Sequence, residues 1–291
     1  MSVIEVESWV EFEKRLQEVR QDATPVGNAG EFLFRGLADS TWELTTTLER
    51  AALGGRAISE YYQIITRLKP QIESFTGNKW KIRAWPKVKQ LLQDYESWAN
   101  SRFPTPEEYS YMVYLRHHGF PSPLLDWTRS PNIAAFFAFR SSEKPGEGKV
   151  SIYAYLEMKP RGYKITTSYK PWIRRGGAFV STHRRHFLQQ SDYTMCAHFR
   201  NDGGQWYFAK HDSVFQGSER HQDFLWKFTI PWTERLNVLR LLDEHNLNAY
   251  SLFGSEESLM ETLAVRVLEL HGHGSIHFLS PRWGVNERKV G

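Results

Sequence analysis

The sequence predicts a single large domain of the α+β class. Residues 150–158 alternate apolar and polar side chains as strands do, and 223–230 form a second strand-like run closed by Pro231. Other stretches repeat apolar residues at helical spacing, and the two patterns do not follow the regular strand–helix–strand order of a parallel sheet. With 291 residues, of which 41% are hydrophobic, the chain is long enough for a sizeable core in one domain with an elaboration.

The first half of the chain is expected to be mostly helical around one short strand. Ser8 and Glu11 form a capping-box pattern, and Pro106 and Gly119 are typical of a helix start and a helix end. The expected elements are a helix over about 10–19, a short buried strand over 31–36, a mostly helical stretch over about 48–100 and a helix over about 106–118.

The second half is expected to alternate strands and helices without a repeat. Ser255 precedes two acidic residues and is predicted to cap a helix. The expected elements are a helix over 132–140, strands over 150–158 and 223–230, and helices over 236–246 and about 256–270. We therefore predict an N-terminal helical segment (1–27), one α+β domain (28–270) with a helical insertion at about 50–110, and a C-terminal tail (271–291).

Composition and sequence pattern limit the classes of protein to which this chain can belong. Cys196 is the single cysteine, so no internal disulfide is possible, which suits a reducing compartment. The longest apolar run, 133–139, is far short of the ~20 residues that span a bilayer, and the first residues have no signal-peptide pattern. We expect a cytoplasmic protein without membrane contact. A net charge of +4 does not by itself predict nucleic-acid binding.

Arg35, His117 and Asp126 are the first candidates for chemistry. Arg35 ends the expected strand, where its planar fork suits a phosphate or carboxylate, although a structural ion pair is the alternative. His117 and His118 end a helix and point about 100° apart, so they would not chelate one metal ion together. The sequence has no other metal-ligand spacing, and we expect no metal. Asp126 either caps a turn or holds an arginine or histidine.

Two further regions carry charge patterns. No acidic residue lies between Glu157 and Asp192, whereas basic residues, among them Arg174 and Arg175, alternate there with aromatic ones such as Tyr163. This mixture favours a nucleotide or single-stranded nucleic acid, and a solvated basic loop is the alternative. Three glutamates follow the break at 253–254, where acids in a first helical turn need no function; they are Glu256, Glu257 and Glu261.

These features occur in the order of a known family. Three segments resemble the FRG domain. They are residues 34–36 (Phe-Arg-Gly), followed by 40–44 (Ser-Thr-Trp-Glu-Leu) and Arg50; the block 116–131 (Arg-His-His-Gly-Phe-Pro-Ser-Pro-Leu-Leu-Asp-Trp-Thr-Arg-Ser-Pro); and the Ala-rich run 134–138. A weaker similarity at 239–259 extends the resemblance to about 28–265. Two departures are Arg116, where the family usually has glutamine, and Pro123, where it usually has arginine. The resemblance places the chain among bacterial and phage proteins.

The motif order of the FRG domain also resembles the ADP-ribosyltransferase superfamily. That resemblance implies a split sheet of short strands with surrounding helices and a helical insertion. It also implies that Arg35, Thr128 and a late glutamate, for which we take Glu257, form a catalytic set acting on NAD. A carboxylate there would stabilise the oxocarbenium ion that forms when nicotinamide leaves.

The same resemblance suggests which residues would hold NAD. His117 and Asp126 would orient the catalytic groups, and Trp127 or Tyr163 would stack on nicotinamide. Arg174 and Arg175 belong to the basic stretch that would meet the pyrophosphate or a macromolecular acceptor, either protein or nucleic acid.

Three functions are open from the sequence. The first is a NAD-dependent ADP-ribosyltransferase or NAD glycohydrolase, with a toxin or phage-defence role that rests on family context. It predicts that Arg35, Thr128 and one glutamate converge in one pocket. The second is a non-catalytic module that binds a nucleotide or nucleic acid, and the third is a protein-interaction module built on the many aromatic residues.

Overall fold

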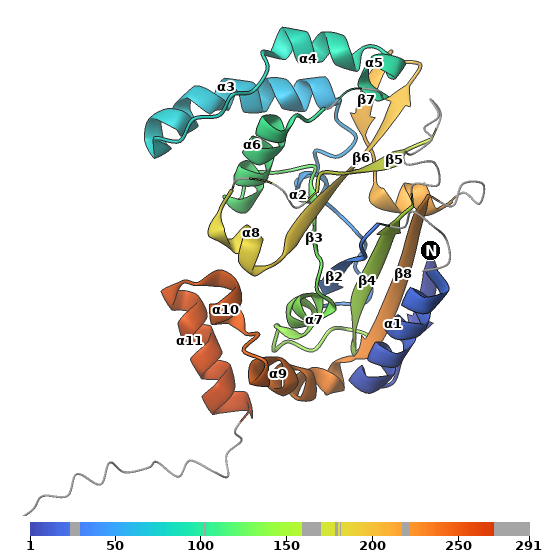
Figure 1. Ribbon diagram of the computed structural model, residues 1–291, viewed down its shortest axis with the longest axis vertical. Coiled ribbons are helices and arrows are strands. Elements are labelled where there is room, and N and C mark those ends of the chain that lie inside the picture. Colours follow the sequence, from blue (N-terminus) through green and yellow to red (C-terminus); the bar gives the residue numbers. More distant parts are fainter. Residues whose placement is uncertain are drawn as a thin grey trace, which may run out of the picture.

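A computed structural model describes residues 1–23, 30–99, 101, 103–158, 170–177, 180, 182–216 and 222–270 (Figure 1). These residues form one sheet of eight strands in the order β1-β8-β4-β2-β3-β6-β5, with β7 paired to β6. The pairing of β1 with β8 is parallel, and the other pairs are antiparallel. The strands are β1 (Ser2–Glu5), β2 (Leu33–Leu37), β3 (Leu125–Thr128), β4 (Lys149–Glu157), β5 (Trp172–Arg175), β6 (Ser191–Arg200), β7 (Gln205–Phe208) and β8 (Asp223–Pro231).

Helices cover the sheet in two groups. The helices described are α1 (Trp9–Ala23), α2 (Thr47–Arg50), α3 (Ile58–Thr76), α4 (Trp85–Leu92), α5 (Tyr95–Ala99), α6 (Pro106–His117), α7 (Pro131–Phe139), α8 (Arg184–Leu188), α9 (Arg235–Glu244), α10 (Ala249–Phe253) and α11 (Glu256–Ala264). Short 3-10 turns lie at His211–Gln216 and Trp232–Glu234, and a π-helical turn, Val265–Leu270, follows α11.

The two groups have separate cores. In Figure 1, α1, α7 and α9 pack below against β2, β4 and β8, and their apolar faces form one buried cluster. The insertion helices α3 to α6 lie above and form a second cluster with β6 and β7, centred on Trp98 and Trp206. A third cluster occupies the opposite face of β2 and β4 and includes Trp127.

The sheet is split where the two groups meet. β2 and β4 pair along five residues, but β2 and β3 share one pair, Phe34 with Thr128. Away from that pair the two strands diverge, which opens the sheet beside Arg35. The backbone carbonyl of Asp126 there accepts a hydrogen bond from the Arg35 side chain, because buried donors and acceptors need partners.

Close packing of two backbones lies directly beside this split. A Cβ atom added to Gly36 of β2 would come within 1.8 Å of the carbonyl oxygen of Ala134 and within 2.8 Å of the nitrogen of Ala138, both in α7. Glycine on the strand and alanines on the helix therefore let the two backbones approach. The glycine of the Phe-Arg-Gly motif and the Ala-rich helix form one packing unit.

The expected α+β class is confirmed, and the expected elements over 31–36, 106–118, 132–140, 150–158 and 223–230 occur within two residues of their expected bounds. The segment expected as an N-terminal helix also contributes β1, and α1 packs into the lower core. The tail 271–291 lies outside the described residues. No helix among those described is long and apolar enough to cross a membrane.

Candidate functional site

A cleft of about 390 Å³ opens at the split between β2 and β3. We call it the arginine cleft. β2 supplies Arg35, β3 supplies Asp126 and Thr128, and α6 supplies Arg116 and His117. Its further lining residues come from the loop after β2 and from α2, α7, the turn after α8 and β6; among them are Trp42, Arg50, Phe137, Gln189, Ser191 and Tyr193. Such a volume lies within the usual range for small-molecule sites.

Arg35 bridges the gap between the diverging strands. Its Nη1 donates a hydrogen bond of 2.7 Å to the backbone carbonyl of Asp126 and lies 3.7 Å from Asp126 Oδ2. The side chain is 14% exposed, and its Nε is buried without a hydrogen-bond partner. Burial lowers the pKa of Arg35, and the positive charges of Arg116 and Arg50 lower it further, whereas Asp126 opposes them.

Positive charge exceeds negative charge in the arginine cleft. Arg116 pairs with Asp126 through a short contact, and its own Nε is buried without a partner. Arg50, which ends α2, is exposed at the rim. Among the described lining residues, three arginines thus face one carboxylate, so the cleft has unused donors for an anion.

A histidine and a tyrosine form the inner wall. His117 Nε2 lies 2.7 Å from the hydroxyl oxygen of Tyr193, which is also 3.4 Å from Nδ1 of the buried His186. Burial lowers the pKa of His117 to about 4, although the Asp126 carboxylate opposes this shift. At neutral pH His117 is therefore an uncharged hydrogen-bonding group.

Hydroxyl, amide and ring groups complete the lining. Thr128 is buried, and its hydroxyl oxygen accepts a hydrogen bond of 3.2 Å from the backbone N–H of Ser130. Gln189 lies beside it in the wall, and its amide donates to the backbone of Leu252 at 3.3 Å. Trp42 is 55% exposed, so its ring is open to a planar ligand.

The structure brings five of the predicted site residues to one cleft: Arg35, His117, Asp126, Trp127 and Thr128. Trp127 borders the cleft, but its ring serves the core. Its indole N–H donates to Thr194 Oγ1 at 2.7 Å, and the ring packs against Tyr155 at 5.4 Å. With 3% exposure, that ring is not open to nicotinamide.

The late glutamates lie elsewhere. Glu257 is exposed in the first turn of α11, where hydrogen bonding to Ser255 is the main cause that lowers its pKa. Glu261 forms a two-pronged ion pair with Arg140, both contacts being 2.6 Å. Glu256, beside them, is exposed as well. None of the three lines the arginine cleft, so the expected convergence of Arg35, Thr128 and a glutamate is not seen among the described residues.

Arg174 and Arg175 of β5 are occupied by the fold. Arg174 lies between the rings of Trp98 and Trp172, at 4.3 and 4.8 Å, and donates to backbone carbonyls in 98–103. Arg175 pairs with the buried Asp192 at 2.6 Å and reaches Glu31 at 3.2 Å. Neither residue lines the arginine cleft. Tyr163, the remaining predicted site residue, lies outside the described residues.

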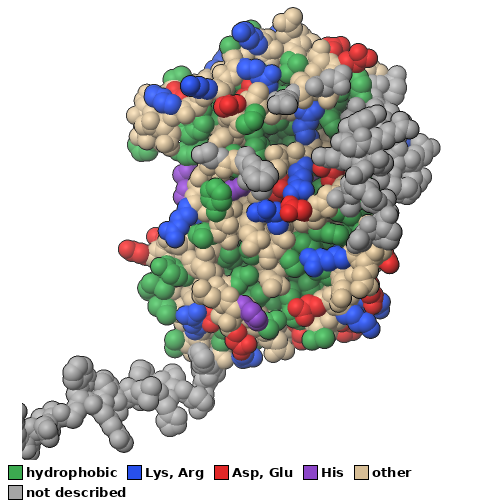
Figure 2. All heavy atoms as spheres, viewed as in Figure 1, with side chains coloured by type: hydrophobic (Ala, Val, Ile, Leu, Met, Phe, Trp, Pro, Cys, Tyr) green, Lys and Arg blue, Asp and Glu red, His purple; other side chains and the backbone are tan. Residues whose placement is uncertain are grey.

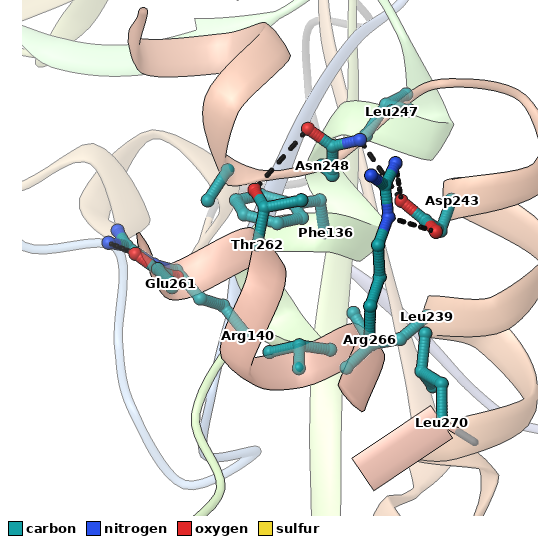
Figure 3. A pocket seen from close by; sticks show the side chains of 12 residues that line it. Phe136, Arg140, Leu239, Asp243, Leu247, Asn248, Glu261, Thr262, Arg266 and Leu270 are labelled. Carbon is teal, nitrogen blue, oxygen red and sulfur yellow. Dashed lines mark hydrogen bonds and ion pairs between the residues drawn. The ribbon is translucent and has the colours of Figure 1, made fainter. Parts of the chain in front are cut away.

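A second pocket lies between α7, α9 and α11 (Figure 3). It holds only about 30 Å³, and its polar side chains bind one another. Arg266 forms two contacts with Asp243 (2.7 and 2.8 Å), and Asn248 Nδ2 donates to the same carboxylate at 3.0 Å. We therefore interpret this pocket as a packing contact between helices and not as a ligand site. No group of three His, Cys, Asp or Glu side chains in the described part of the chain is placed to hold a metal ion.

The cleft residues that sequence reasoning did not assign to a site include Trp42, Arg50, Arg116 and Tyr193. Arg116 had a signal, because it replaces the glutamine usual in the resembled family. The short motif that follows residue 36 contains Trp42 and leads to Arg50, so both could have been found there. Tyr193 had none, since strand β6 was not expected and carries no motif.

Residues 30–147 match the FRG domain family. The match covers both motifs and the insertion helices between them, whereas the weaker similarity expected at 239–259 lies beyond it. The comparison with curated proteins found no match, and neither did the comparison with solved structures. The chain therefore contains an FRG domain at residues 30–147, which supplies Arg35, Arg116, His117, Asp126 and Thr128 to the arginine cleft.

Proposed function

We propose that the arginine cleft binds NAD and that the protein cleaves the bond between nicotinamide and ribose, passing ADP-ribose to an acceptor or to water. The observation that carries the proposal is the surplus of arginine in the cleft. Arg35, Arg50 and Arg116 face a single carboxylate, Asp126. NAD supplies the missing charge, because its two linked phosphates carry two negative charges in a compact group.

The arginines suit a pyrophosphate in particular. Guanidinium groups bind phosphate oxygens through two parallel hydrogen bonds, and partly buried groups gain more from such contacts than exposed ones. Arg35 and Arg116 are 14% and 19% exposed, and each retains a buried, unpartnered Nε. Arg50, exposed at the rim, would close over a bound phosphate.

The remaining lining fits the rest of a dinucleotide. Trp42 offers an open ring for a base, and Phe137 borders the cleft from α7. The hydroxyls of Thr128 and Tyr193 and the amide of Gln189 are suited to ribose hydroxyls. The neutral His117 can orient the Tyr193 hydroxyl without adding charge.

Asp126 is the carboxylate best placed for the chemistry. When the C1′–N1 bond breaks, its electron pair leaves with nicotinamide and positive charge develops on the ribose. A nearby carboxylate stabilises that oxocarbenium character. An acceptor oxygen or nitrogen then donates an electron pair to C1′ and loses its proton. Bound phosphates would draw Arg35 and Arg116 from Asp126 and leave its carboxylate free to face the ribose.

The split sheet supports the same proposal. The resemblance to the ADP-ribosyltransferase superfamily implies a split sheet of short strands, and here β2 and β3 share one residue pair. Arg35 stands at that opening and Thr128 is the residue paired across it. In that architecture the acidic residue would come from the strand after the split instead of from α11.

Nicotinamide release from NAD by the purified protein tests the proposal. We expect release by the wild-type protein, its loss in Arg35→Ala and Asp126→Asn, and its retention in Glu257→Ala. The matched control is Arg15→Ala, which removes an exposed arginine from α1. Loss in Glu257→Ala would instead move the catalytic carboxylate to α11. Absence of release by a folded wild-type protein, with protein and nucleic-acid acceptors present, would overturn cleavage.

A further inference from the structure

The helical insertion carries a strongly basic stretch. Residues 67–89 contain seven basic residues and one acidic residue. The acidic one, Glu73, already contacts Lys69 at 2.8 Å and Lys79 at 3.9 Å. The stretch spans the end of α3, the loop to α4 and the start of α4, and Figure 2 shows Lys and Arg side chains gathered over this upper part of the molecule.

A groove of about 690 Å³ lies under that loop, between it and α6. We call it the insertion groove. Lys79, Trp80 and Lys81 form one side, and Tyr114 and His183 line the other. Lys79 is 73% exposed, so its ammonium group is open to solvent despite the long contact with Glu73. Glu107 also lines the groove, which confines an anionic ligand to the lysine side.

A series of rings runs from the insertion groove to the arginine cleft. Trp80 contacts Tyr114 with ring centroids 4.7 Å apart, and Tyr114 contacts His118 at 4.2 Å. His183 then lies 6.0 Å from His118 and 6.1 Å from His117, which lines the cleft. The two sites are therefore neighbours joined by planar side chains.

This combination matches the chemistry of single-stranded nucleic acid. Aromatic rings that are partly exposed, as Trp80 and Tyr114 are, can stack on unpaired bases whatever their sequence, and lysines beside them follow the phosphates. A duplex hides its base faces and would use the lysines alone. An acidic protein segment would likewise use the lysines and leave the rings unused.

We propose that the insertion groove binds single-stranded nucleic acid and delivers it to the arginine cleft as the acceptor of ADP-ribose. The delivery step rests on the proposed function, whereas the binding step does not. The strand would lie with its phosphates on Lys79 and Lys81 and its bases on Trp80 and Tyr114. Its next nucleotides would pass the histidines toward Asp126.

Fluorescence anisotropy of a labelled single-stranded oligonucleotide, measured on the full chain without NAD, tests the binding step. The Lys79→Glu/Lys81→Glu double variant should bind at least about 10-fold more weakly, and the slope of log affinity against log salt should fall by about two. The matched control, Lys14→Glu/Lys144→Glu, makes the same charge change at exposed sites outside the groove and should bind like the wild type.

A second variant tests the rings. Trp80→Leu should weaken binding by about 5- to 150-fold, the range measured for loss of one stacked base. Because Trp80 also packs on Tyr111 at 5.1 Å, His118→Ala, which removes an exposed ring, is measured alongside it. A duplex of the same sequence should bind more weakly than the single strand.

The outcomes separate the two proposals. Equal binding of duplex and single strand, or equal losses in the groove and control variants, would overturn the insertion groove as a single-strand site. Binding without nicotinamide release would leave the groove standing and overturn cleavage. Nicotinamide release without oligonucleotide binding would overturn the groove alone. With both present, ADP-ribose should appear on the oligonucleotide and should be lost in the double lysine variant.

Discussion

Two arginine clusters in this molecule use the same side chain in opposite ways. In the arginine cleft, Arg35, Arg50 and Arg116 share one carboxylate, and two of the guanidinium groups retain buried donors without partners. At β5, Arg174 meets two indole rings and several carbonyls, and Arg175 meets two carboxylates. Both clusters contain partly buried cations, yet only the first has donors left over.

The two clusters differ in how many of the guanidinium N–H groups have a hydrogen-bond partner. A buried cation whose donors are all bound strengthens the fold, and a ligand could bind it only by breaking those contacts. A buried cation with spare donors is left less stable in the free protein and gains when an anion arrives. The comparison therefore predicts that variants at β5 change stability, whereas variants in the arginine cleft change binding.

Arg174→Ala should have the largest effect, and on stability. It removes charge-assisted hydrogen bonds to carbonyls of 98–103 and a cation sandwiched by Trp98 and Trp172. We expect the free energy of unfolding to fall by about 3–4 kcal/mol, since each such contact contributes about 1–3 kcal/mol and they are not additive. Urea unfolding measures the loss, and Arg15→Ala should change it little. Nicotinamide release per folded molecule should stay unchanged. A selective loss of release would show that Arg174 takes part in NAD binding, as the sequence predicted.

Arg35→Ala should show the reverse pattern. It removes repulsion with Arg116 and Arg50 together with one hydrogen bond, so the two changes in stability partly cancel. Binding of NAD or of inorganic pyrophosphate should weaken by about 30- to 150-fold, because a charge-assisted contact contributes about 2–3 kcal/mol. Isothermal titration calorimetry provides the affinity. A variant that loses stability as Arg174→Ala does, while binding pyrophosphate normally, would make Arg35 a structural residue.

Sequence reasoning located the parts of the fold that local pattern determines. Proline, glycine and capping residues marked α6 and α7, and alternation marked β4, because these signals act within a few residues. Strands β5, β6 and β7 were not expected. β5 is a short polar-aromatic run, and its place depends on pairing with β6, whose position in the sheet is set by β3. Such long-range pairing has no local signal.

The site residues can be divided in the same way, into those that a local motif identifies and those that it does not. The motifs identified Arg35, His117, Asp126 and Thr128, which the split in the sheet brings together. The basic stretch at 159–186 predicts either a contact with a nucleotide or nucleic acid or a solvated basic loop, but Arg174 and Arg175 there are bound within the fold. The stretch at 67–89, with seven basic residues and one acidic residue, was predicted only as helical, because its apolar residues recur at helical spacing. Charge along a sequence does not tell which cations will find partners.

Protonation of His117 tests the comparison between the arginine cleft and β5. It would add a fourth positive charge to a cleft in which three arginines already face one carboxylate. The groups that face it are Asp126, His183, His186 and Arg116, and burial is the main cause that lowers its pKa to about 4. Between pH 6.5 and 4 the unfolded chain binds a proton at this position and the native state does not, so falling pH favours unfolding. We expect His117 to account for about 2 kcal/mol of stability lost between pH 7 and pH 5.

Urea unfolding at the two pH values of wild type, His117→Gln and His118→Gln isolates this contribution. Glutamine at 117 can still reach the Tyr193 hydroxyl but does not titrate, so His117→Gln should lose about 2 kcal/mol less than the wild type on acidification. His118 is exposed on the same helix end, and His118→Gln is the control for replacing a histidine there. Equal pH dependence in all three proteins would show that His117 titrates normally.

Asp126→Asn gives the smallest expected change in binding free energy and the sharpest test of how the cleft works. Asparagine keeps the shape and can still accept a hydrogen bond from Arg116, but the negative charge that occupies Arg35 and Arg116 is gone. Pyrophosphate should therefore bind more tightly, by about 5- to 10-fold for about 1 kcal/mol of competing attraction removed. Cleavage of NAD should fall in the same variant, because the carboxylate that stabilises the ribose is lost.

Tighter binding together with lost cleavage is a result that a purely structural ion pair would not give. If pyrophosphate binds more weakly in Asp126→Asn, the carboxylate holds the arginines in place for the ligand and does not compete with it, and the cleft resembles β5 more closely than its spare donors suggest.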